Sequence, residues 1–469
     1  MALKQFTIDF VNIGLQDGLR LDFGYRYFFD YKKGKVFPSD QLISLREILT
    51  PLNSPKVKKG LLDNEEILLD IGNVERRFNN LINYEVVEEV GSDKVVIEKG
   101  DLVIPKLQPQ MGNIFLNPKH KRFLGSTEFV EYKINSSYNP LFLYYLITSK
   151  QFLTDLARLE SGKTHRRVNS RDFLKIKIPL IPKSQQDTIV AQIEPIEKEI
   201  KHLKSQLKDP QEIINKVFAR EFGFDLEKFE QAKEEKFFDV SFEKIGKNDL
   251  LRFSVHFQHK KLNFIEFKLK DKDKWENLTN KFKLAGGKRI PKGKNVSNEE
   301  TGYYYLRPTE VSFWGIDKNN LLFLPRDIYK KLKRYRINSG EFAISIVGTL
   351  GKTAFVDNKK LDIEEDNLIL SENFIKLTPK VNLNNLFYYY FFYSFIFETQ
   401  TEREYTITSI KKLGIDKWSY IKIPNTPLSH QQRIVDEIQA ELNKQEEIKK
   451  KIEKKRNKID EIIERTVVN

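Results

Sequence analysis

The chain of 469 residues contains no cysteine, only two methionines, three tryptophans and six histidines. Without cysteine it forms neither disulfide bonds nor thiolate metal sites, which fits a reducing compartment, and so few histidines argue against a metal site. The longest apolar run, residues 386–397, has about 12 residues where a membrane span needs about 20. The first residues also lack the apolar core of a signal peptide. We therefore expect a cytoplasmic protein with no membrane contact.

Basic residues are in excess, because 80 lysines and arginines stand against 66 aspartates and glutamates, a net charge of +14. This balance is typical of proteins that bind polyanions such as nucleic acids. A lysine-rich composition shared by a whole proteome produces the same excess, so charge alone does not decide between these readings. Hydrophobic residues make up 40% of the chain, which is enough to build buried cores.

The sequence repeats itself over most of its length. Residues 176–193, IKIPLIPKSQQDTIVAQI, return as residues 421–438, IKIPNTPLSHQQRIVDEI, 245 positions later. Upstream, residues 141–153 match 386–398 at the same offset, while Gly100 matches Gly340 at an offset of 240. Loop insertions between two homologous domains produce an offset that grows along the chain in this way. A period of this length indicates two whole domains rather than a solenoid.

Each domain is followed by a long helix. Isoleucine and leucine recur at spacings of four and three from Ile189 to Leu207, and a similar stripe runs from Ile434 to Ile463. We expect Ser184 and Ser429 to cap these helices, with Gln432 completing a capping box at the second. Pro195 should kink the first helix, and the Asp209-Pro210 step should end or restart it.

A narrow apolar stripe must be covered, so the simplest arrangement pairs the two helices antiparallel. The alternative is that each helix folds onto its own domain. The first arrangement predicts an α+β fold with two repeated domains, separated by two long antiparallel coiled-coil helices, with pseudo-twofold symmetry. The predicted bounds are 1–183 and 245–428 for the domains, and 184–244 and 429–469 for the helical spacer regions.

Local patterns that suggest catalysis do not survive comparison with the other copy of the repeat. The Asn-Pro-Leu-Phe sequence at Asn139 is similar to a methyltransferase motif, but it lacks a second proline. The other copy has Asn384 at this position without any proline, and a helix cap explains the asparagine in both copies. The segment Gly348–Thr353 lacks the first glycine of a phosphate-binding loop and predicts a tight turn. His256 and His259 have no metal-ligating counterpart in the first copy. We therefore expect no active site.

Basic, amide and aromatic residues on loops are the better signal, because arginine, lysine, glutamine and asparagine bond base edges and phosphates. These loops differ between the copies while the framework repeats, as two readers of different sequences require. The candidates in the first domain are Arg76, Arg77, Lys106, Gln108, Gln110, Lys163, His165, Arg166 and Arg167. Those in the second domain are Lys288, Arg289, Lys292, Lys294, Tyr305, Arg307, Arg334 and Arg336.

The chain resembles the specificity subunits of type I restriction-modification systems. The resemblance rests on IPLIPKSQQDTIVAQIEPIEKEI and IPNTPLSHQQRIVDEIQAELNKQEEI, on the segments GDLVI…MGNIFL and GEFAISIVGTLGKTAFV, and on the order of domains and helices. It departs from the family where Gln185-Gln186 and His430-Gln431 replace the usual Glu-Gln, and in a longer central stretch, residues 218–242.

The resemblance implies two target recognition domains, each reading one half of a split double-stranded DNA sequence. It also implies that the helices form a fixed spacer and that two methyltransferase subunits and motor-nuclease restriction subunits join the complex. No active site belongs to such a chain, since S-adenosylmethionine, ATP and Mg²⁺ belong to the partners in the prokaryotic cytoplasm. The alternatives are a specificity component of a type IIB or IIG system and a non-catalytic basic DNA-binding scaffold. A net charge of +14 argues against an acidic DNA mimic.

Overall fold

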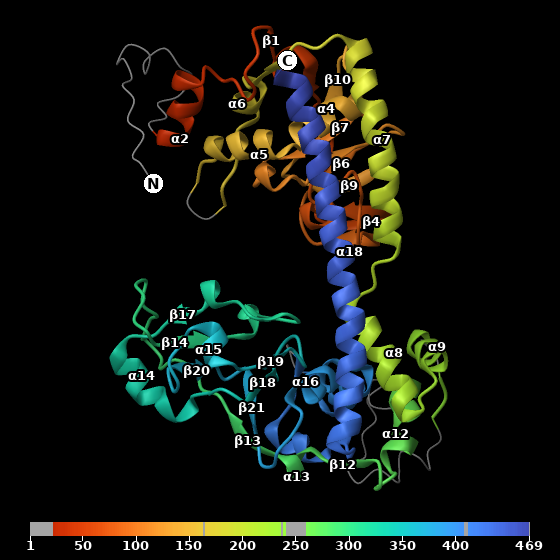
Figure 1. Cartoon of the computed structure of the whole chain (residues 1–469), viewed down its shortest axis with the longest axis vertical. Helices are drawn as coiled ribbons and strands as arrows, with labels where there is room; N and C mark the ends of the chain where they lie inside the picture. Colours follow the sequence, from red (N-terminus) through yellow and green to blue (C-terminus); the bar gives the residue numbers. More distant parts are fainter. Residues whose placement is uncertain (1–21, 163–164, 236–237, 241–258, 408–410, 469) are drawn as a thin grey trace. The chain divides into compact units, whose positions relative to one another are not determined.

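The computed structural model describes residues 22–162, 165–235, 238–240, 259–407 and 411–468, and it divides into two compact units (Figure 1). Unit 1 is formed by Met1–Gln206 and Ile448–Asn469, and unit 2 by Leu207–Glu447. The C-terminal segment of the chain thus belongs to the same unit as the first domain. The predicted boundary between residues 244 and 245 lies outside the described residues, so the domain bounds stay predictions.

The two larger sheets of unit 1 share one core. A four-stranded antiparallel sheet has the order β2-β10-β7-β8, and a five-stranded sheet has the order β3-β6-β9-β4-β5. Buried Leu69, Val103 and Phe129, from strands of both sheets, pack in one cluster. The strands are β2 (Leu49–Pro51), β3 (Lys56–Val57), β4 (Gly60–Leu69), β5 (Glu85–Val90), β6 (Lys94–Ile97), β7 (Leu102–Pro105), β8 (Phe115–Leu116), β9 (Phe123–Ser126) and β10 (Phe129–Ile134).

The helices of unit 1 follow the apolar runs of its sequence. In α4 (Pro140–Ile147), all six residues from Phe142 to Ile147 are buried, because a helix that is apolar all round must lie inside the protein. Asn139 caps this helix by accepting from the Leu141 amide at 2.9 Å. The other helices are α2 (Phe23–Arg26), α3 (Leu45–Ile48), α5 (Lys150–Leu156), α6 (Ser170–Leu174) and α7 (Lys183–Ser205).

Unit 2 has an antiparallel sheet of the same size as that of unit 1, in the order β13-β21-β18-β19, and a smaller sheet, β17-β14-β20. Phe282, Phe342 and Phe392 lie in one buried cluster against it. The strands are β13 (Phe282–Gly286), β14 (Tyr304–Leu306), β15 (Val311–Ser312), β16 (Gly315–Ile316), β17 (Leu322–Phe323), β18 (Phe342–Ser345), β19 (Thr353–Phe355), β20 (Leu368–Leu370), β21 (Phe374–Pro379), β22 (Thr406–Ile407) and β23 (Lys411–Lys412). The helices are α8 (Pro210–Phe222), α9 (Leu226–Glu234), α12 (Lys260–Leu269), α13 (Leu278–Lys281), α14 (Arg326–Leu332), α15 (Asn358–Leu361), α16 (Asn385–Tyr393) and α17 (Phe395–Glu404).

The repeat in the sequence is a repeat in the fold, which confirms the predicted α+β class with two copies of one domain. In unit 1, β1 (Leu42–Ser44) pairs antiparallel with β11 (Lys177–Pro179). In unit 2, β12 (Trp275–Asn277) pairs in the same register with β24 (Lys422–Pro424). Each pair closes its domain and leads into a long helix. In both units a parallel strand pair, β4 with β9 and β14 with β20, also lies in the second sheet.

One buried glutamine in each unit ties the long helix to its domain. The Gln186 side chain donates to the Ile181 carbonyl at 2.7 Å and accepts from the Asn139 amide at 2.7 Å. Gln431, 245 positions later, accepts from the Asn384 amide at 3.2 Å. Both glutamines are almost fully buried, so each bond satisfies a polar group that water does not reach.

The starts of the long helices differ from the sequence prediction. Helix α7 begins at Lys183 after Pro182, and α18 (Leu428–Val468) begins one residue before Ser429. The predicted caps Ser184 and Ser429 therefore lie in the first turns. Before α7, Pro182 provides the extended backbone, with φ of −57° and ψ of 143°. The predicted capping box is also wrong, since Gln432 bonds Asn384 and Asp436 instead.

The helix after the first domain pairs antiparallel with the C-terminal helix, as predicted, but each unit contains one such pair and the two pairs are built from three helices. Helix α7 continues through Pro195 and ends at Ser205, and a new helix, α8, starts at Pro210. In unit 1, α7 and the end of α18 lie side by side in opposite directions, joined by an ion pair between Glu199 and Lys455 (Figure 1). The predicted apolar seam is buried at Ile189, Ile193, Ile196, Ile200, Ile452, Ile459 and Ile463.

In unit 2, α8 runs antiparallel to the beginning of α18. The Lys208 amide donates to the Gln445 side chain at 2.9 Å, and Arg220 donates to Glu437 at 2.8 Å. One continuous helix of 41 residues, about 60 Å long at 1.5 Å per residue, thus serves both units. Among the described residues, no helix is long and apolar enough to cross a membrane.

Candidate nucleic-acid interface

Unit 1 brings together the three loops that carry its predicted binding residues, at positions 70–83, 106–113 and, among the described residues, 160–162 with 165–168. The Gln108 amide donates to the Arg166 carbonyl at 3.1 Å, which joins the second loop to the third. The Arg77 amide donates to the Gly112 carbonyl at 2.8 Å, which joins the first loop to the second. Backbone bonds therefore hold the three loops as one surface.

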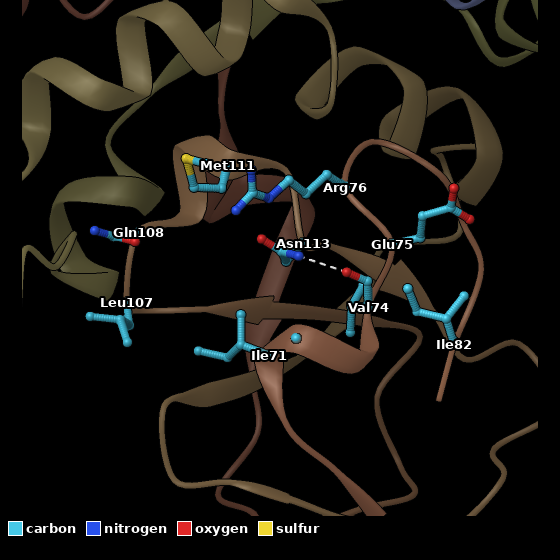
Figure 2. Close-up of a pocket in the computed structure, with 10 residues that line it drawn as sticks. Ile71, Val74, Glu75, Arg76, Ile82, Leu107, Gln108, Met111 and Asn113 are labelled. Atoms are coloured by element: carbon cyan, nitrogen blue, oxygen red, sulfur yellow. Dashed lines mark hydrogen bonds between the residues drawn. The ribbon is translucent and has the colours of Figure 1, made fainter. Parts of the chain in front are cut away.

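An open pocket of about 580 Å³ lies between the first two of these loops (Figure 2). Figure 2 shows the exposed Arg76 side chain extending over the pocket toward Met111, with Gln108 on the same rim. Asn113 is buried beneath and donates to the Val74 carbonyl at 2.6 Å, so it fixes the pocket wall. The pocket is lined by Ile71, Gly72, Val74, Glu75, Arg76, Ile82, Leu107, Gln108, Met111 and Asn113.

Arg167 is held in place by an acidic neighbour. Its guanidinium donates to both carboxylate oxygens of Glu128, at 3.0 and 2.8 Å. The hydrogen bond from Arg167 lowers the pKa of Glu128 below its usual range. A fork of this kind orients the guanidinium while leaving it half exposed, as a reader of base edges or phosphates requires.

The remaining candidates of unit 1 differ in exposure. His165 and Arg166 are exposed, and Arg166 lies 4.0 Å from the Glu160 carboxylate. Lys106 and Gln110 are half buried. Lys163 lies outside the described residues.

Arg77 points away from the pocket, into the body of unit 1. Its Nε donates to the Thr148 carbonyl at 3.1 Å, and its Nη2 forms an ion pair with Asp460 of α18. The chain at Arg77 is left-handed, with φ of 62°. The Arg77 side chain therefore holds its loop in place, whereas the side chain of the neighbouring Arg76 faces the pocket.

In unit 2, four groups gather where the parallel strands β14 and β20 end. Tyr305 is 4% exposed, and its hydroxyl donates to the Lys288 carbonyl at 2.9 Å and to Glu372 at 3.2 Å. Arg289, which is exposed, donates to Glu372 at 2.6 Å. Burial raises the pKa of Tyr305, so its proton stays in place for these bonds. Burial also raises the pKa of Glu372, but the hydrogen bonds from Arg289, a backbone amide and Tyr305, together with the charge of Arg289, outweigh it and the net shift is downward.

The other candidates of unit 2 make contacts of their own. Arg307 donates to Glu310 at 2.6 Å, and Arg336 pairs with Asp366 at 2.5 Å. The Arg334 guanidinium stacks 4.6 Å from the centre of the Tyr335 ring. Lys294 lies 3.5 Å from Asp327 on α14, and Lys292 is exposed. The segments that carry Arg289, Tyr305 and Arg334 pack around one apolar cluster, through Ile290, Tyr305 and Tyr335.

A family model described as the type I restriction modification DNA specificity domain matches the chain twice, over residues 28–209 and 272–456. The chain belongs to this family. It is a DNA specificity subunit of a type I restriction-modification system. The first match lies mainly in unit 1 and ends at the break between α7 and α8, and the second lies mainly in unit 2.

Solved structures of type I systems are similar to this specificity subunit over most of its length. One, from a study of complex assembly and conformational transition of the type I R-M system, is 15% identical with a TM-score of 0.41, covering 92% of this chain and 97% of that one. The HsdS subunit from Thermoanaerobacter tengcongensis is 16% identical with a TM-score of 0.34, over 92% and 96%. The S subunit from M. genitalium is 14% identical with a TM-score of 0.33, over 92% and 96%. No curated protein matches the chain.

The sequence patterns that suggested catalysis form helix caps and a turn in the specificity subunit. Asn139 and Asn384 cap α4 and α16, as predicted. The segment Gly348–Thr353 forms the turn between antiparallel strands β18 and β19, also as predicted. His259 caps α12 by accepting from the Lys261 amide at 3.3 Å, and His256 lies outside the described residues. Within the described ranges, no three histidine or acidic side chains gather as metal ligands.

Two kinds of residue in the specificity subunit escaped the sequence analysis. Trp314 is 57% exposed at the two-residue turn between β15 and β16, where unit 1 has the Arg76 loop. An aromatic pair before glycine between two short strands is the signal that predicts such a turn. Glu128 and Glu372 each stand two positions after the equivalent strands β9 and β20, and each binds a candidate arginine. In the sequence, the only signal for Glu128 and Glu372 was an acidic residue two positions after the end of a strand.

Proposed function

We propose that this specificity subunit is non-catalytic and that each unit reads one half of a bipartite double-stranded DNA target. One observation carries the proposal: the same strand register and the same glutamine contact occur in both units, while the exposed loop residues differ. A repeated framework places two reading surfaces in equivalent positions, and different side chains on them select different bases.

In unit 1 the proposed DNA contacts come from Arg76 and Gln108 at the pocket and from the oriented Arg167. In unit 2 they come from Arg289, held by Glu372, and from the exposed Lys292. Guanidinium forks and amides suit base edges in the major groove, and lysine suits phosphates. We assign Arg77 and Tyr305, which were predicted to bind DNA, to holding the loops that carry these side chains.

The chemistry of the complex belongs, in this proposal, to other chains. Two methyltransferase subunits bind S-adenosylmethionine, and motor-nuclease restriction subunits bind ATP and Mg²⁺, in the prokaryotic cytoplasm where the DNA lies. The specificity subunit supplies the position on DNA, through basic loops that bind phosphates and read bases.

The test is the sequence methylated by the complex of this chain with its methyltransferase partner. Arg76→Ala should weaken or relax recognition of one half-site, because one bidentate base contact is worth about 1–3 kcal/mol of discrimination. Arg289→Ala should affect the other half-site. Lys228→Ala, which removes an exposed charge from α9, is the matched control and should leave both half-sites unchanged. Methyl transfer by the purified chain alone would contradict the proposal.

A further inference from the structure

The loop that carries Arg76 is a strained structure that needs support. It is a short hairpin in which the Glu75 amide donates to the Asn80 carbonyl at 3.0 Å. The backbone of Arg77 is left-handed, with φ of 62°, a conformation that residues other than glycine seldom adopt without compensating contacts. Gly112 lies so close that a Cβ there would stand 2.7 Å from the Arg77 side chain, so the two loops interlock.

The support comes from the last turns of α18. Arg456 is 1% exposed, and its Nε donates to the Arg77 carbonyl at 3.1 Å. Its Nη2 donates to the Thr148 carbonyl at 3.1 Å, and its Nη1 to Asp460 at 3.3 Å. Asp460 in turn pairs with Arg77. Each buried charge therefore has a partner, as burial requires.

Unit 2 holds its corresponding loop in another way. Gln211 and Asn215 of α8 lie 245 positions before Arg456 and Asp460, and Gln211 donates to the carbonyl of Tyr393, which is equivalent to Thr148. The loop at Trp314 is instead held by tyrosines of its own domain. Tyr389 donates to the Phe313 carbonyl at 2.5 Å. The Tyr393 hydroxyl, which donates to the Thr353 carbonyl at 2.7 Å, also lies 3.3 Å from the Ser312 carbonyl.

We propose that Arg456 and Asp460 are positioning residues for DNA recognition by unit 1: by holding Arg77 inward, they fix Arg76 over the pocket. The C-terminal helix, more than 370 residues from the loop in sequence, thus sets how well the first half-site is read. The recognition part of this inference rests on the proposed function, whereas the support of the loop does not.

Hydrogen exchange of the full chain tests the support directly. Asp460→Asn and Arg456→Gln reproduce the polarity of unit 2. Each should speed exchange of the Arg77 amide by about tenfold or more, the effect of losing one hydrogen bond to a charged group. The loop at residues 311–316 should exchange as before and serves as an internal reference. Arg465→Gln, in an exposed position near the end of the same helix, is the matched control.

The second readout is discrimination by the complex with its methyltransferase partner, measured on duplexes altered in one half-site or the other. The variants should lose discrimination at the half-site read by unit 1 and keep it at the other, whereas a merely structural role would weaken both alike. Arg456→Lys keeps the positive charge but lacks the several N–H groups of the guanidinium. It is measured in place of Arg456→Gln or Asp460→Asn if either of these does not fold. Unchanged exchange at Arg77, or equal losses at both half-sites, would overturn the inference. If the wild-type complex shows no sequence preference, the proposed function fails, and the exchange result still decides whether α18 supports the loop.

Discussion

The two units hold equivalent helices through different kinds of side chain: where one unit uses charged groups, the other uses neutral ones. Where helix meets domain, unit 1 buries the charges of Arg456 and Asp460, while unit 2 uses the amides of Gln211 and Asn215. At one position between the two helices of each pair, it is unit 2 that has the charged contacts and unit 1 that has a neutral residue. Unit 2 has Glu221 in contact with Arg433, His430 and Arg220, and unit 1 has Thr466 at the equivalent position, bonded to its own helix.

The difference shows which parts of the repeat are interchangeable. Backbone registers and the buried glutamine are common to both units, so they specify the fold of either one. The contacts of the helix that pairs with the long helix after each domain, the end of α18 in unit 1 and α8 in unit 2, are not common. An amide cannot replace the Arg456 guanidinium, which donates to four acceptor atoms of three residues at once. Each helix segment therefore fits its own unit, which favours one pairing of segments within the chain.

The largest expected difference is between Arg456→Ala and Gln211→Ala. Removing Arg456 leaves Asp460 buried beside fewer partners, and we expect a loss of about 3–5 kcal/mol in the unfolding free energy of unit 1. Removing Gln211 loses one neutral bond to the Tyr393 carbonyl, and about 1 kcal/mol is expected. Urea denaturation of the two variants measures both values, and equal losses would show that the charged contact has no special weight.

The shared contact should behave alike in both units. Gln186→Ala leaves the Asn139 amide and the Ile181 carbonyl without a partner, and Gln431→Ala does the same to the Asn384 amide and the Thr426 carbonyl. We expect each variant to lose about 1–3 kcal/mol. A large difference between the two in denaturation would break the equivalence of the frameworks.

The charged helix pair of unit 2 should make its stability depend on pH. Burial raises the pKa of Glu221, but hydrogen bonds from Arg433, His430 and Arg220 outweigh it and lower the pKa to about 2. A lowered carboxyl pKa stabilises the folded state above the unfolded value near 4.5, and this contribution disappears as the pH falls toward 2. Its arginine partners are half exposed and screened by solvent, so Glu221→Gln should cost only about 1–2 kcal/mol at pH 7.

Denaturation of the Glu221→Gln variant and the wild-type chain at several pH values measures this effect. Thr466→Ala is the control from unit 1, and its effect should not vary with pH. A Glu221→Gln effect that is the same at pH 7 and pH 3 would contradict the assignment.

The smallest effects on stability are expected at the exposed arginine forks. Arg167→Ala and Arg289→Ala break ion pairs with Glu128 and Glu372, which solvent screens at such exposure, so we expect little change in the unfolding free energy. Each should nevertheless lower the affinity for one half-site, as measured by titration with duplexes altered in either half. Loss of folding stability without loss of affinity would assign these pairs to structure alone.

The repeat made the framework predictable from sequence. The matches between residues 176–193 and 421–438 placed the closing strands and the helix starts to within two residues. The cap Ser184 was mispredicted because the preceding Pro182 already supplies the extended backbone, so the helix begins earlier. The break at Asp209-Pro210 was predicted, but periodicity alone did not show that α8 would take over as the partner helix in unit 2.

The site was less predictable than the framework. Loop composition marked Arg76 and Arg77 together, and only the structure separates them, because the left-handed turn sends one side chain out and the other toward Asp460. That contact joins residues 383 positions apart, which no local pattern indicates. Glu128 and Glu372 escaped because an acidic side chain is not expected on a DNA-binding surface until its arginine partner is seen.

The central claim, that two equivalent frameworks read separate half-sites, is tested most directly by exchanging one domain. Residues 278–421 begin and end beside each other, since the Leu278 amide donates to the Ile421 carbonyl at 2.9 Å. Replacing them with the equivalent segment of another family member, while retaining Asn384 and Gln400 for their bonds to Gln431 and Lys422, keeps the helix contacts. The methylated sequence of the resulting complex should change in one half only. A change in both halves, or in neither half of an active complex, would contradict the account.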